Sequence, residues 1–234
     1  MKSTYIIFAF SIACALFSAG LYAQTATPAG DKATTVKSKS DPDVRAGQWV
    51  AALNLNDAAK EARVAAVITA HLMAVRDWNN NHPYTLTPEG INPITGKVFS
   101  KLERQLIINS TIPKTVHDDL MAGLRKDLTE EQVELILDKY TIGKVAFTMS
   151  GYKSIVPDLT QVEESFILTN LKLAREQAVD YKNIDQISVI FKIYKTKIED
   201  YFNNNGRNWK QMYKNYADQA KAKKAAGNAK PAKP

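Results

Sequence analysis

Residues 76–84 gather the side-chain types that sugar- and carboxylate-binding sites use. Arg76, Asp77 and Trp78 come first, three asparagines and a histidine follow, and Tyr84 closes the segment. In such sites aromatic rings stack on sugars, amides sort hydroxyl groups, and a guanidinium holds a carboxylate. The structural alternative is that Trp78 completes the buried face of a helix and the asparagines end that helix.

A second segment, residues 203–209, has the same character. Three asparagines and Gly206 form a turn, and Arg207, Asn208 and Trp209 follow it directly. Arg207 is suited to holding a carboxylate through two parallel hydrogen bonds. The alternative is a glycine-ended helix followed by a core tryptophan. One cleft shared by the two segments is the hypothesis that unites them.

A third segment, residues 140–152, departs from good helix-forming composition because it contains two glycines and several β-branched residues. Small residues on a helix permit either close packing or the approach of a ligand to the backbone. Lys144, Tyr152 and the nearby Asp158 could supply the acid or base of a lyase or hydrolase. A lysine or arginine would then hold the substrate carboxylate.

The three histidines, His71, His82 and His117, are far apart in the sequence, and no zinc-binding spacing connects them. His71 falls within an apolar helical stripe, which favours a buried structural histidine. His117 is followed by two aspartates, but adjacent residues on a helix point in different directions and do not converge on one ligand. We therefore expect no metal site.

Several familiar classes of enzyme are excluded by missing motifs. The chain has no Gly-x-Ser-x-Gly elbow, no Walker loop and no dinucleotide-binding fingerprint. Serine hydrolases of that type, P-loop enzymes and NAD enzymes are therefore not expected. The sequence predicts no cofactor.

The chain has 234 residues, 45% of them hydrophobic and 24% charged, with a formal net charge of +7. The location of this charge matters more than its size. Lys2 and the five lysines of residues 219–234 account for all but one of the net positive charges. A nearly neutral core does not resemble a nucleic-acid-binding surface, so no nucleic-acid partner is expected.

Residues 1–23 have the pattern of a secretory signal peptide. A single Lys2 precedes an apolar run, and Ala23 ends the segment at the expected cleavage position. We expect a periplasmic or secreted protein with no transmembrane segment after cleavage. The only cysteine, Cys14, would leave with the signal, so neither a disulfide nor a thiol nucleophile is expected.

The remaining chain is predicted to be all-α, with a single globular domain of about seven helices over residues 44–218. A flexible linker at 24–43 precedes it, and a disordered tail rich in lysine and alanine follows at 219–234. The first long helix carries an apolar stripe from Val64 to Trp78 and is expected to start after a cap at Asn54 or Asn56. A long irregular loop, residues 79–98, follows it.

Three capping boxes predict helix starts, namely Ser100 with Glu103, Thr129 with Gln132 and Thr160 with Glu163. The helical period that begins after Thr129 continues past residue 140 to Tyr152, and the helix is expected to end before Pro157. A short last helix is expected over residues 209–216. No segment has the alternation of a strand.

Several stretches of this core form a distinctive set. They are DKYTIGKVAFT (138–148), Tyr152, IVPDLT (155–160), GRNW (206–209), VRDW (75–78) and GLRKDLT (123–129). Together they resemble a secreted bacterial family, domain of unknown function 3826. The resemblance spans residues 53–216. It implies an exported helical domain, found in bacteria that degrade plant polysaccharides such as pectin, and it brings no catalytic residues with it.

Three hypotheses for function follow. The first is an exported accessory protein that binds acidic plant oligosaccharides through the residues of the first two segments. The second is a glycan lyase or hydrolase of the same pathway that uses the third segment. The third is an envelope-associated protein-interaction domain with a lysine-rich attachment tail. The sequence does not predict the oligomeric state.

Overall fold

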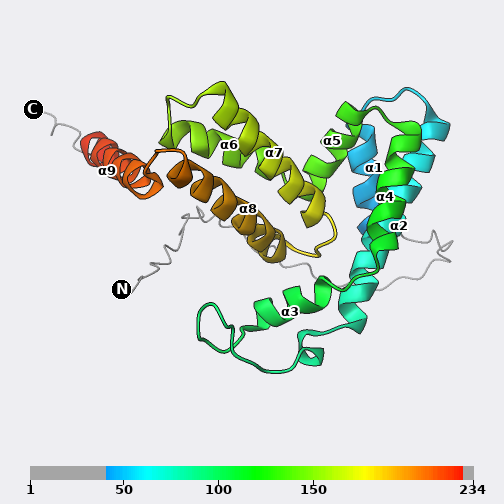
Figure 1. The fold of residues 1–234 in the computed structure, drawn as a ribbon. Helices are drawn as coiled ribbons and strands as arrows, with labels where there is room; N and C mark the ends of the chain where they lie inside the picture. Colours follow the sequence, from blue (N-terminus) through cyan, green and yellow to red (C-terminus); the bar gives the residue numbers. More distant parts are fainter. Residues whose placement is uncertain (1–40, 229–234) are drawn as a thin grey trace, which may run out of the picture. The chain divides into compact units, whose positions relative to one another are not determined.

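The computed structural model describes residues 41–228. The predicted signal peptide, the predicted linker up to residue 40 and the last six residues of the predicted tail lie outside the described residues. The described part is all-α, as predicted, and contains no strand beyond a single bridge between Ile91 and Val98. Its helices are α1 Asp41–Ala51, α2 Ala58–Asn81, the 3₁₀ turn η1 Tyr84–Leu86, α3 Lys101–Asn109, α4 Lys114–Asp127, α5 Glu130–Tyr140, α6 Lys144–Ile155, α7 Gln161–Ala178, α8 Ile184–Asn204 and α9 Trp209–Asn228 (Figure 1).

All three predicted capping boxes are present. Ser100, Thr129 and Thr160 each accept a hydrogen bond from the backbone three residues later, and the side chain at that later position bonds back. Each pair satisfies two backbone N–H groups that the first helical turn would otherwise leave without a partner. The starts of α3, α5 and α7 are therefore fixed by local sequence.

The cap of the first long helix differs from the prediction. Asp57, not Asn54 or Asn56, accepts the hydrogen bond from Lys60 N, at 2.9 Å. Asn54 and Asn56 instead adopt positive φ values of 50° and 55° in the preceding turn. Asparagine tolerates this conformation better than most residues, so both asparagines serve the turn and leave the cap to the aspartate.

Helix α1 is an addition to the prediction and begins at Asp41, before the predicted domain start at residue 44. Only three of its residues are buried, namely Pro42, Ala46 and Val50. This stripe is too narrow to stand out in the sequence, although Asp41 and Asp43 suit the first turn of a helix electrostatically. Helix α1 packs mainly against α2.

The helical period expected to run from residue 129 to Tyr152 is interrupted between α5 and α6. Ile142 has a φ of 55° and Gly143 a φ of 64°, and Gly143 N donates to the carbonyl of Asp138. This is the usual six-to-one closure of a helix end, with Ile142 at the position that normally holds glycine. Ile142 is 73% exposed and does not join the apolar stripe.

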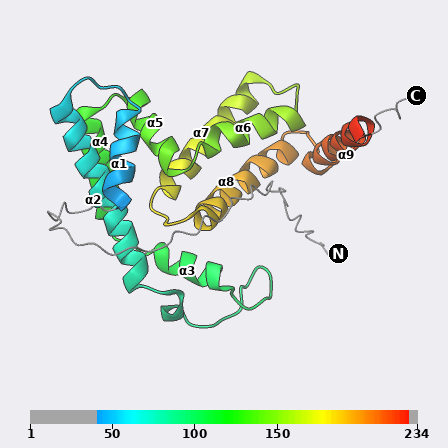
Figure 2. The same cartoon turned by 180° about the vertical axis from the view of Figure 1, so that it is seen from behind.

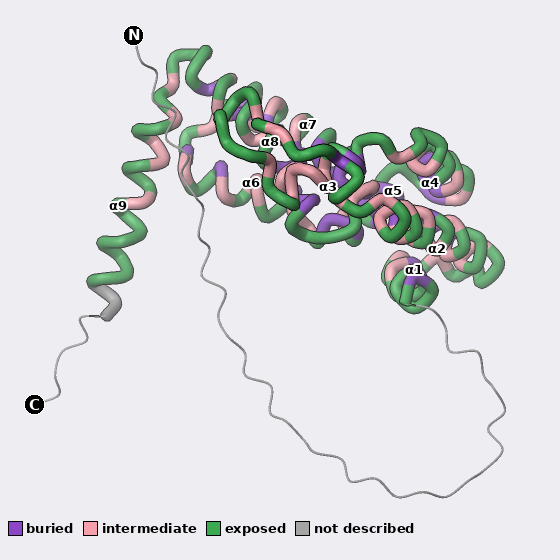
Figure 3. Tube along the Cα trace, turned by 90° about the horizontal axis from the view of Figure 1, so that it is seen from below, coloured by how far each residue is buried: buried purple, intermediate pink, exposed green. Residues whose placement is uncertain are grey.

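The last helix is longer than predicted. Helix α9 runs to Asn228 and so continues into the segment expected to be disordered. The residues beyond Tyr216 are mostly alanine, lysine and glutamine, which have high helix propensity and little apolar surface to bury. Figure 3 accordingly shows α9 as largely exposed, with intermediate burial near its start.

The buried apolar residues form two clusters. The first cluster is built mainly from α1, α2, α4 and α5 and the second from α6, α7 and α8, with Trp209 and Met212 of α9 packed against it. In the first cluster α2 and α4 lie so close that a Cβ on Gly123 would sit 2.7 Å from Val67 Cγ1, which explains the glycine.

The chain passes from the second cluster into the first at the end of α7. Ile167 and Leu171 of α7 lie in the second cluster, whereas Val179, directly after the helix, lies in the first. Helix α7 contacts α8, α6 and α5 (Figure 1; Figure 2). Its charged residues Lys172, Arg175 and Glu176 face α5 and α4, and this is where the candidate site lies.

Candidate functional site

A carboxylate at the carboxyl end of α7 joins two histidines from two other helices. His71 Nε2 of α2 lies 3.0 Å from Asp180 Oδ1, and His117 Nδ1 of α4 lies 2.9 Å from Asp180 Oδ2. The His71 side chain is 1% exposed, that of Asp180 15% and that of His117 22%. Both imidazoles thus donate to one largely buried carboxylate, and only His117 reaches solvent to a useful degree.

The charges in this cluster stabilise each other. The hydrogen bond and negative charge of Asp180 raise the pKa of His117, although burial acts in the opposite sense. Burial by itself raises the pKa of Asp180, but hydrogen bonds from His117 and His71 outweigh it and lower that pKa below its ordinary value. Both shifts favour the imidazolium paired with the carboxylate.

The interior side of the cluster contains further polar atoms. The Tyr140 ring meets the His71 ring edge-on, with centroids 5.3 Å apart. Burial, reinforced by the charge of Asp180, raises the pKa of the Tyr140 hydroxyl, which therefore stays protonated. Neither this hydroxyl nor His71 Nδ1 has a hydrogen-bond partner within the described part of the chain. Uncompensated polar burial of this kind is costly and tends to mark functional regions.

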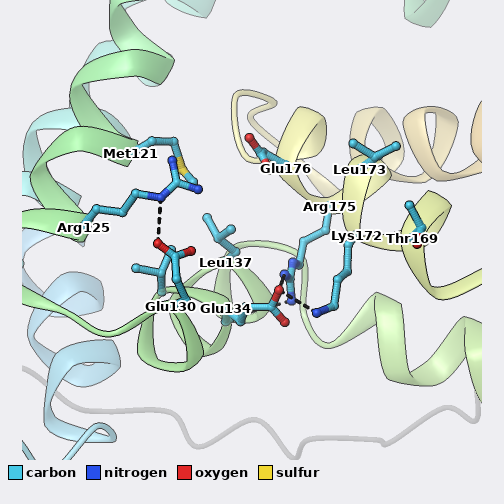
Figure 4. A pocket seen from close by; sticks show the side chains of 11 residues that line it. Met121, Arg125, Glu130, Glu134, Leu137, Thr169, Lys172, Leu173, Arg175 and Glu176 are labelled. Carbon is cyan, nitrogen blue, oxygen red and sulfur yellow. Dashed lines mark hydrogen bonds and ion pairs between the residues drawn. The ribbon is translucent and has the colours of Figure 1, made fainter. Parts of the chain in front are cut away.

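A surface groove lies beside this cluster, between α4, α5 and α7 (Figure 4). Its volume is about 230 Å³, and it is open to solvent. Glu176 lines the groove and also lies 3.7 Å from His117 Nε2, which connects the groove to the histidine cluster. The lining residues are Met121, Arg125, Glu130, Val133, Glu134, Leu137, Thr169, Lys172, Leu173, Arg175 and Glu176.

The cations of the groove are held by carboxylates of α5. Lys172 and Arg175 both reach Glu134, at 2.8 and 3.2 Å, and Arg175 also reaches Asp138 at 2.8 Å. Burial favours a raised pKa for Glu134, but Lys172 and Arg175 together lower it. The Arg175 side chain is 3% exposed, and its Nε has no hydrogen-bond partner among residues 41–228. Arg175 is thus a fixed charge at the base of the groove.

The rim of the groove is less constrained. Arg125 of α4 lies 3.1 Å from Glu130 of α5, with side chains 49% and 67% exposed. Exposed pairs of this type contribute little to stability and are free to rearrange. The groove therefore combines apolar patches, fixed charges at its base and an adjustable cation at its rim.

Residues 76–84 form a local surface rather than a deep site. Arg76 pairs with the neighbouring Asp77 at 2.8 Å, and the Trp78 ring stacks on His82 with centroids 3.7 Å apart. The Tyr84 ring lies beneath two cations. Its centroid is 5.7 Å from Lys101 Nζ and 5.2 Å from the guanidinium carbon of Arg104. Its ring is therefore partly covered and is not a free stacking platform.

Arg207 is occupied by the protein's own carboxylates. It forms two hydrogen bonds with Glu163, through Nε and Nη2, and two more from Nη1 to Asp158, at 3.0 and 3.2 Å. Asn208 accepts from Gln211 N in the first turn of α9. Any ligand carboxylate at Arg207 would have to displace these partners, so this geometry favours the structural alternative for Arg207.

Trp209 and Tyr152 meet inside the second cluster. Their ring centroids are 5.4 Å apart, and Trp209 also stacks on Phe202 at 5.7 Å. Burial raises the pKa of Tyr152, whose hydroxyl lies 3.5 Å from the Lys195 carbonyl oxygen. Lys144 lies over the Phe191 ring, and burial, followed by the charge of Lys195, lowers its pKa.

The structure thus brings the second and third predicted segments together at Tyr152 and Trp209. Residues 76–84 have other neighbours: Trp78 stacks on His82, whereas Trp209 packs against Tyr152 and Phe202. These ring contacts do not support one cleft shared by Trp78 and Trp209. The sequence relates His117 only to the two aspartates that follow it, and it does not reveal the pairing with Asp180. The two residues are 63 positions apart, and no local pattern connects them.

Within residues 41–228, no three His, Cys, Asp or Glu side chains are arranged so that they could hold a metal ion. No helix among these residues is both long and apolar enough to cross a membrane.

The fold and the site define an all-helical domain that carries a buried histidine–aspartate cluster beside a charged surface groove. The family model described as "Protein of unknown function (DUF3826)" matches residues 39–222, so the chain belongs to this family. The resemblance found in the sequence is thereby confirmed. No curated protein matches the chain significantly.

Proposed function

We propose that this domain is an exported binding protein for acidic oligosaccharides, and that the groove between α4, α5 and α7 holds an acidic sugar ring. The observation that carries the proposal is the alternation of cations and carboxylates over apolar side chains in that groove. Carboxylates accept hydrogen bonds from sugar hydroxyls, cations bind the sugar carboxylate, and apolar side chains contact the ring faces.

The openness of the groove supports a polymeric ligand. A free small molecule is usually bound in a cleft that covers most of its surface. A sugar within a chain must leave room for its neighbours on both sides, which an open groove provides. The cation best placed for the sugar carboxylate is Arg125, because its partner Glu130 is exposed and can be exchanged.

Calorimetric titration of acidic and neutral plant oligosaccharides into the protein expressed from Gln24 tests this proposal. Arg125→Ala should weaken binding of uronate-containing ligands by about 1.5 to 3 kcal/mol, as expected for the loss of a charge-assisted hydrogen bond. Arg45→Ala is the matched control, since Arg45 forms an equally exposed pair with Asp41 on α1. Equal affinities of the two variants, or no binding by the unmodified protein, would contradict the proposal.

A second candidate function, a lyase acting on the same ligand, is favoured by the geometry of His117. Asp180 fixes Nδ1, and Nε2 points toward Glu176 in the groove. Neutral His117 could take the proton from the carbon beside the sugar carboxylate, after which a double bond forms and the glycosidic oxygen leaves with a proton. The groove cations would stabilise the charge on the carboxylate.

This second candidate relies on other residues than the sequence suggested. Asp158 is engaged by Arg207 and Tyr152 is buried in the core, so neither is placed as an acid or base. Mass spectrometry of oligogalacturonides incubated with the protein would reveal unsaturated products. Such products should vanish in His117→Ala and persist in His82→Ala, because His82 bonds to the Trp78 carbonyl and touches no part of the groove. If the oligosaccharides stay intact, the lyase function is contradicted and only the binding function remains.

A further inference from the structure

Residues 83–99 form an excursion between α2 and α3 that ends in a small hairpin. Asn92 N donates to the Lys97 carbonyl, and Phe99 N donates to the Gly90 carbonyl. These two bonds enclose the bridge between Ile91 and Val98, which is therefore a pair without mutual backbone hydrogen bonds. Side chains of such a pair lie on one face of the hairpin and close to each other.

The alternation in this hairpin is inverted. Asn92 points back to the body of the domain, where its amide donates to Glu103 Oε1 at 3.0 Å. Because successive side chains of an extended strand point to opposite faces, Ile91 and its partner Val98 point away from the body. They are 66% and 68% exposed. The hairpin therefore turns its polar side toward the domain and leaves its apolar side exposed to solvent. An exposed apolar surface of this kind indicates an interaction site.

The tip of the hairpin extends this apolar face. Ile94 is 92% exposed, and the Asn92 side chain accepts hydrogen bonds from the backbone of Ile94 and Thr95, which fixes the turn. An aliphatic side chain is thus held in place at the outermost point of the excursion. It touches little of the domain, so its conformation is not explained by packing.

The hairpin and its surroundings carry a small net positive charge. Residues 84–104 contain three cations and two carboxylates. Glu89 pairs with Arg104, and Glu103 is held by Ser100 and Asn92. Lys97 and Lys101 are exposed, and among the described residues neither forms an ion pair. The hairpin therefore offers apolar side chains with unneutralised lysines beside them.

This composition distinguishes between two kinds of partner. Protein interfaces are enriched in aromatic residues and arginine and depleted in lysine. Surfaces that lie on a bilayer combine aliphatic side chains with lysines, whose long stems reach the anionic headgroups. We propose that Ile91, Ile94 and Val98 insert into the surface of an anionic lipid membrane, with Lys97 and Lys101 at the headgroups. This proposal is independent of the groove.

Sedimentation with lipid vesicles tests the proposal on the protein expressed from Gln24. Vesicles of phosphatidylcholine alone are compared with vesicles of phosphatidylcholine and phosphatidylglycerol. The protein should bind the anionic vesicles, and Ile94→Ser should lower its partition coefficient about tenfold, since burial of one isoleucine side chain contributes at least that factor. Lys97→Gln should weaken binding less.

Val162→Ser is the control, because Val162 is an aliphatic residue of α7 outside the excursion and, at 70%, about as exposed as Ile91 and Val98. It should bind as the unmodified protein does. The proposal is overturned if no vesicle is bound, or if Ile94→Ser binds as well as Val162→Ser, which would indicate adsorption through the lysine-rich tail. It is also overturned if Ile94→Ser abolishes concentration-dependent self-association without any lipid binding, since the face would then belong to a second copy of the chain.

Discussion

The two ends of α7 each hold a largely buried carboxylate, and their surroundings differ in kind. Glu163 lies in the first turn, where it completes a capping box and accepts two hydrogen bonds from Arg207. Asp180 lies just beyond the last turn and is bound by His117 and His71. A negative charge is favoured at the start of a helix and disfavoured at its end, by about 0.3 to 1 kcal/mol.

This difference separates a structural network from a candidate functional one. Arginine is charged at all accessible pH values, so the Glu163 network has one state, and it ties the start of α7 to the turn before α9. Histidine changes charge near neutral pH, so the Asp180 network has two states. A carboxylate placed against the helix dipole and stabilised by titratable partners has no local folding reason to be there, which points to function.

The largest expected effect is on the Glu163 network. Arg207→Ala should lower the free energy of unfolding by about 3 kcal/mol, because it leaves a buried carboxylate without its cation. Arg207 helps to lower the pKa of Glu163 to about 2, so this stabilisation is complete above the ordinary carboxyl pKa and is lost as the pH falls toward 2. Urea unfolding at neutral and acidic pH measures both effects.

Arg45→Ala controls for the loss of a surface arginine, and its effect should stay within about 0.5 kcal/mol. If Arg207→Ala were as mild as Arg45→Ala, Arg207 would be free to serve a ligand, and the contrast between the two ends of α7 would disappear.

A smaller effect is expected at the other end of the helix. Asp180→Asn should cost about 2 kcal/mol near pH 6, the contribution of hydrogen bonds to a charged group. Because Asp180 raises the pKa of His117, its stabilising effect is complete below the ordinary histidine pKa and is lost as the pH rises through the raised value. The difference between the variant and the unmodified protein should therefore shrink as the pH rises above the ordinary histidine pKa.

The control for Asp180→Asn is Asp77→Asn, which removes an exposed carboxylate that pairs with the adjacent Arg76. It should change neither stability nor its pH dependence measurably. A loss at Asp180 that is constant from weakly acidic to weakly alkaline pH would show that His117 does not titrate with it, and the network would then be as static as that of Glu163.

The smallest effect is expected from the cap that holds Glu163. Thr160→Ala should cost about 1 kcal/mol, the usual contribution of a helix cap. Thr129→Ala at the capping box of α5 is the matched comparison, since Gln132 there is neutral and has no arginine partner in the box. Calorimetric melting should show a larger loss at Thr160, because Glu163 is also loosened. Equal losses would mean that the cap does not position the carboxylate for Arg207.

The features that sequence predicts correctly are those whose partners are close along the chain. The box of Thr160 and Glu163 spans three residues, so its geometry follows from the helix alone. The all-α class follows in the same way from apolar periodicity. Helix α1 was not predicted because its buried stripe is short. The break at Ile142 was not predicted because β-branched residues rarely adopt positive φ.

The candidate site required information that a single sequence does not contain. His71, His117 and Asp180 come from three helices, and Asp180 lies 109 and 63 positions from its partners. Which helix faces cross is decided by packing, including the close approach at Gly123, and not by local pattern. Arg207 is a second example. The residues around it in the sequence suggest ligand binding, but its partner Glu163 lies 44 positions earlier and no local pattern connects the two.

The chain passes directly from one apolar cluster into the other at the end of α7, and this bears on how the domain opens. Ala178 is buried in the second cluster and its neighbour Val179 in the first, so neither core can open far without disturbing the other, and the halves lose the freedom to unfold independently. Slowly exchanging amide hydrogens in α2 of the first cluster and α8 of the second should then report the same opening free energy. The domain would behave as one cooperative unit, and fluctuations within it would be confined to the excursion and the end of α9.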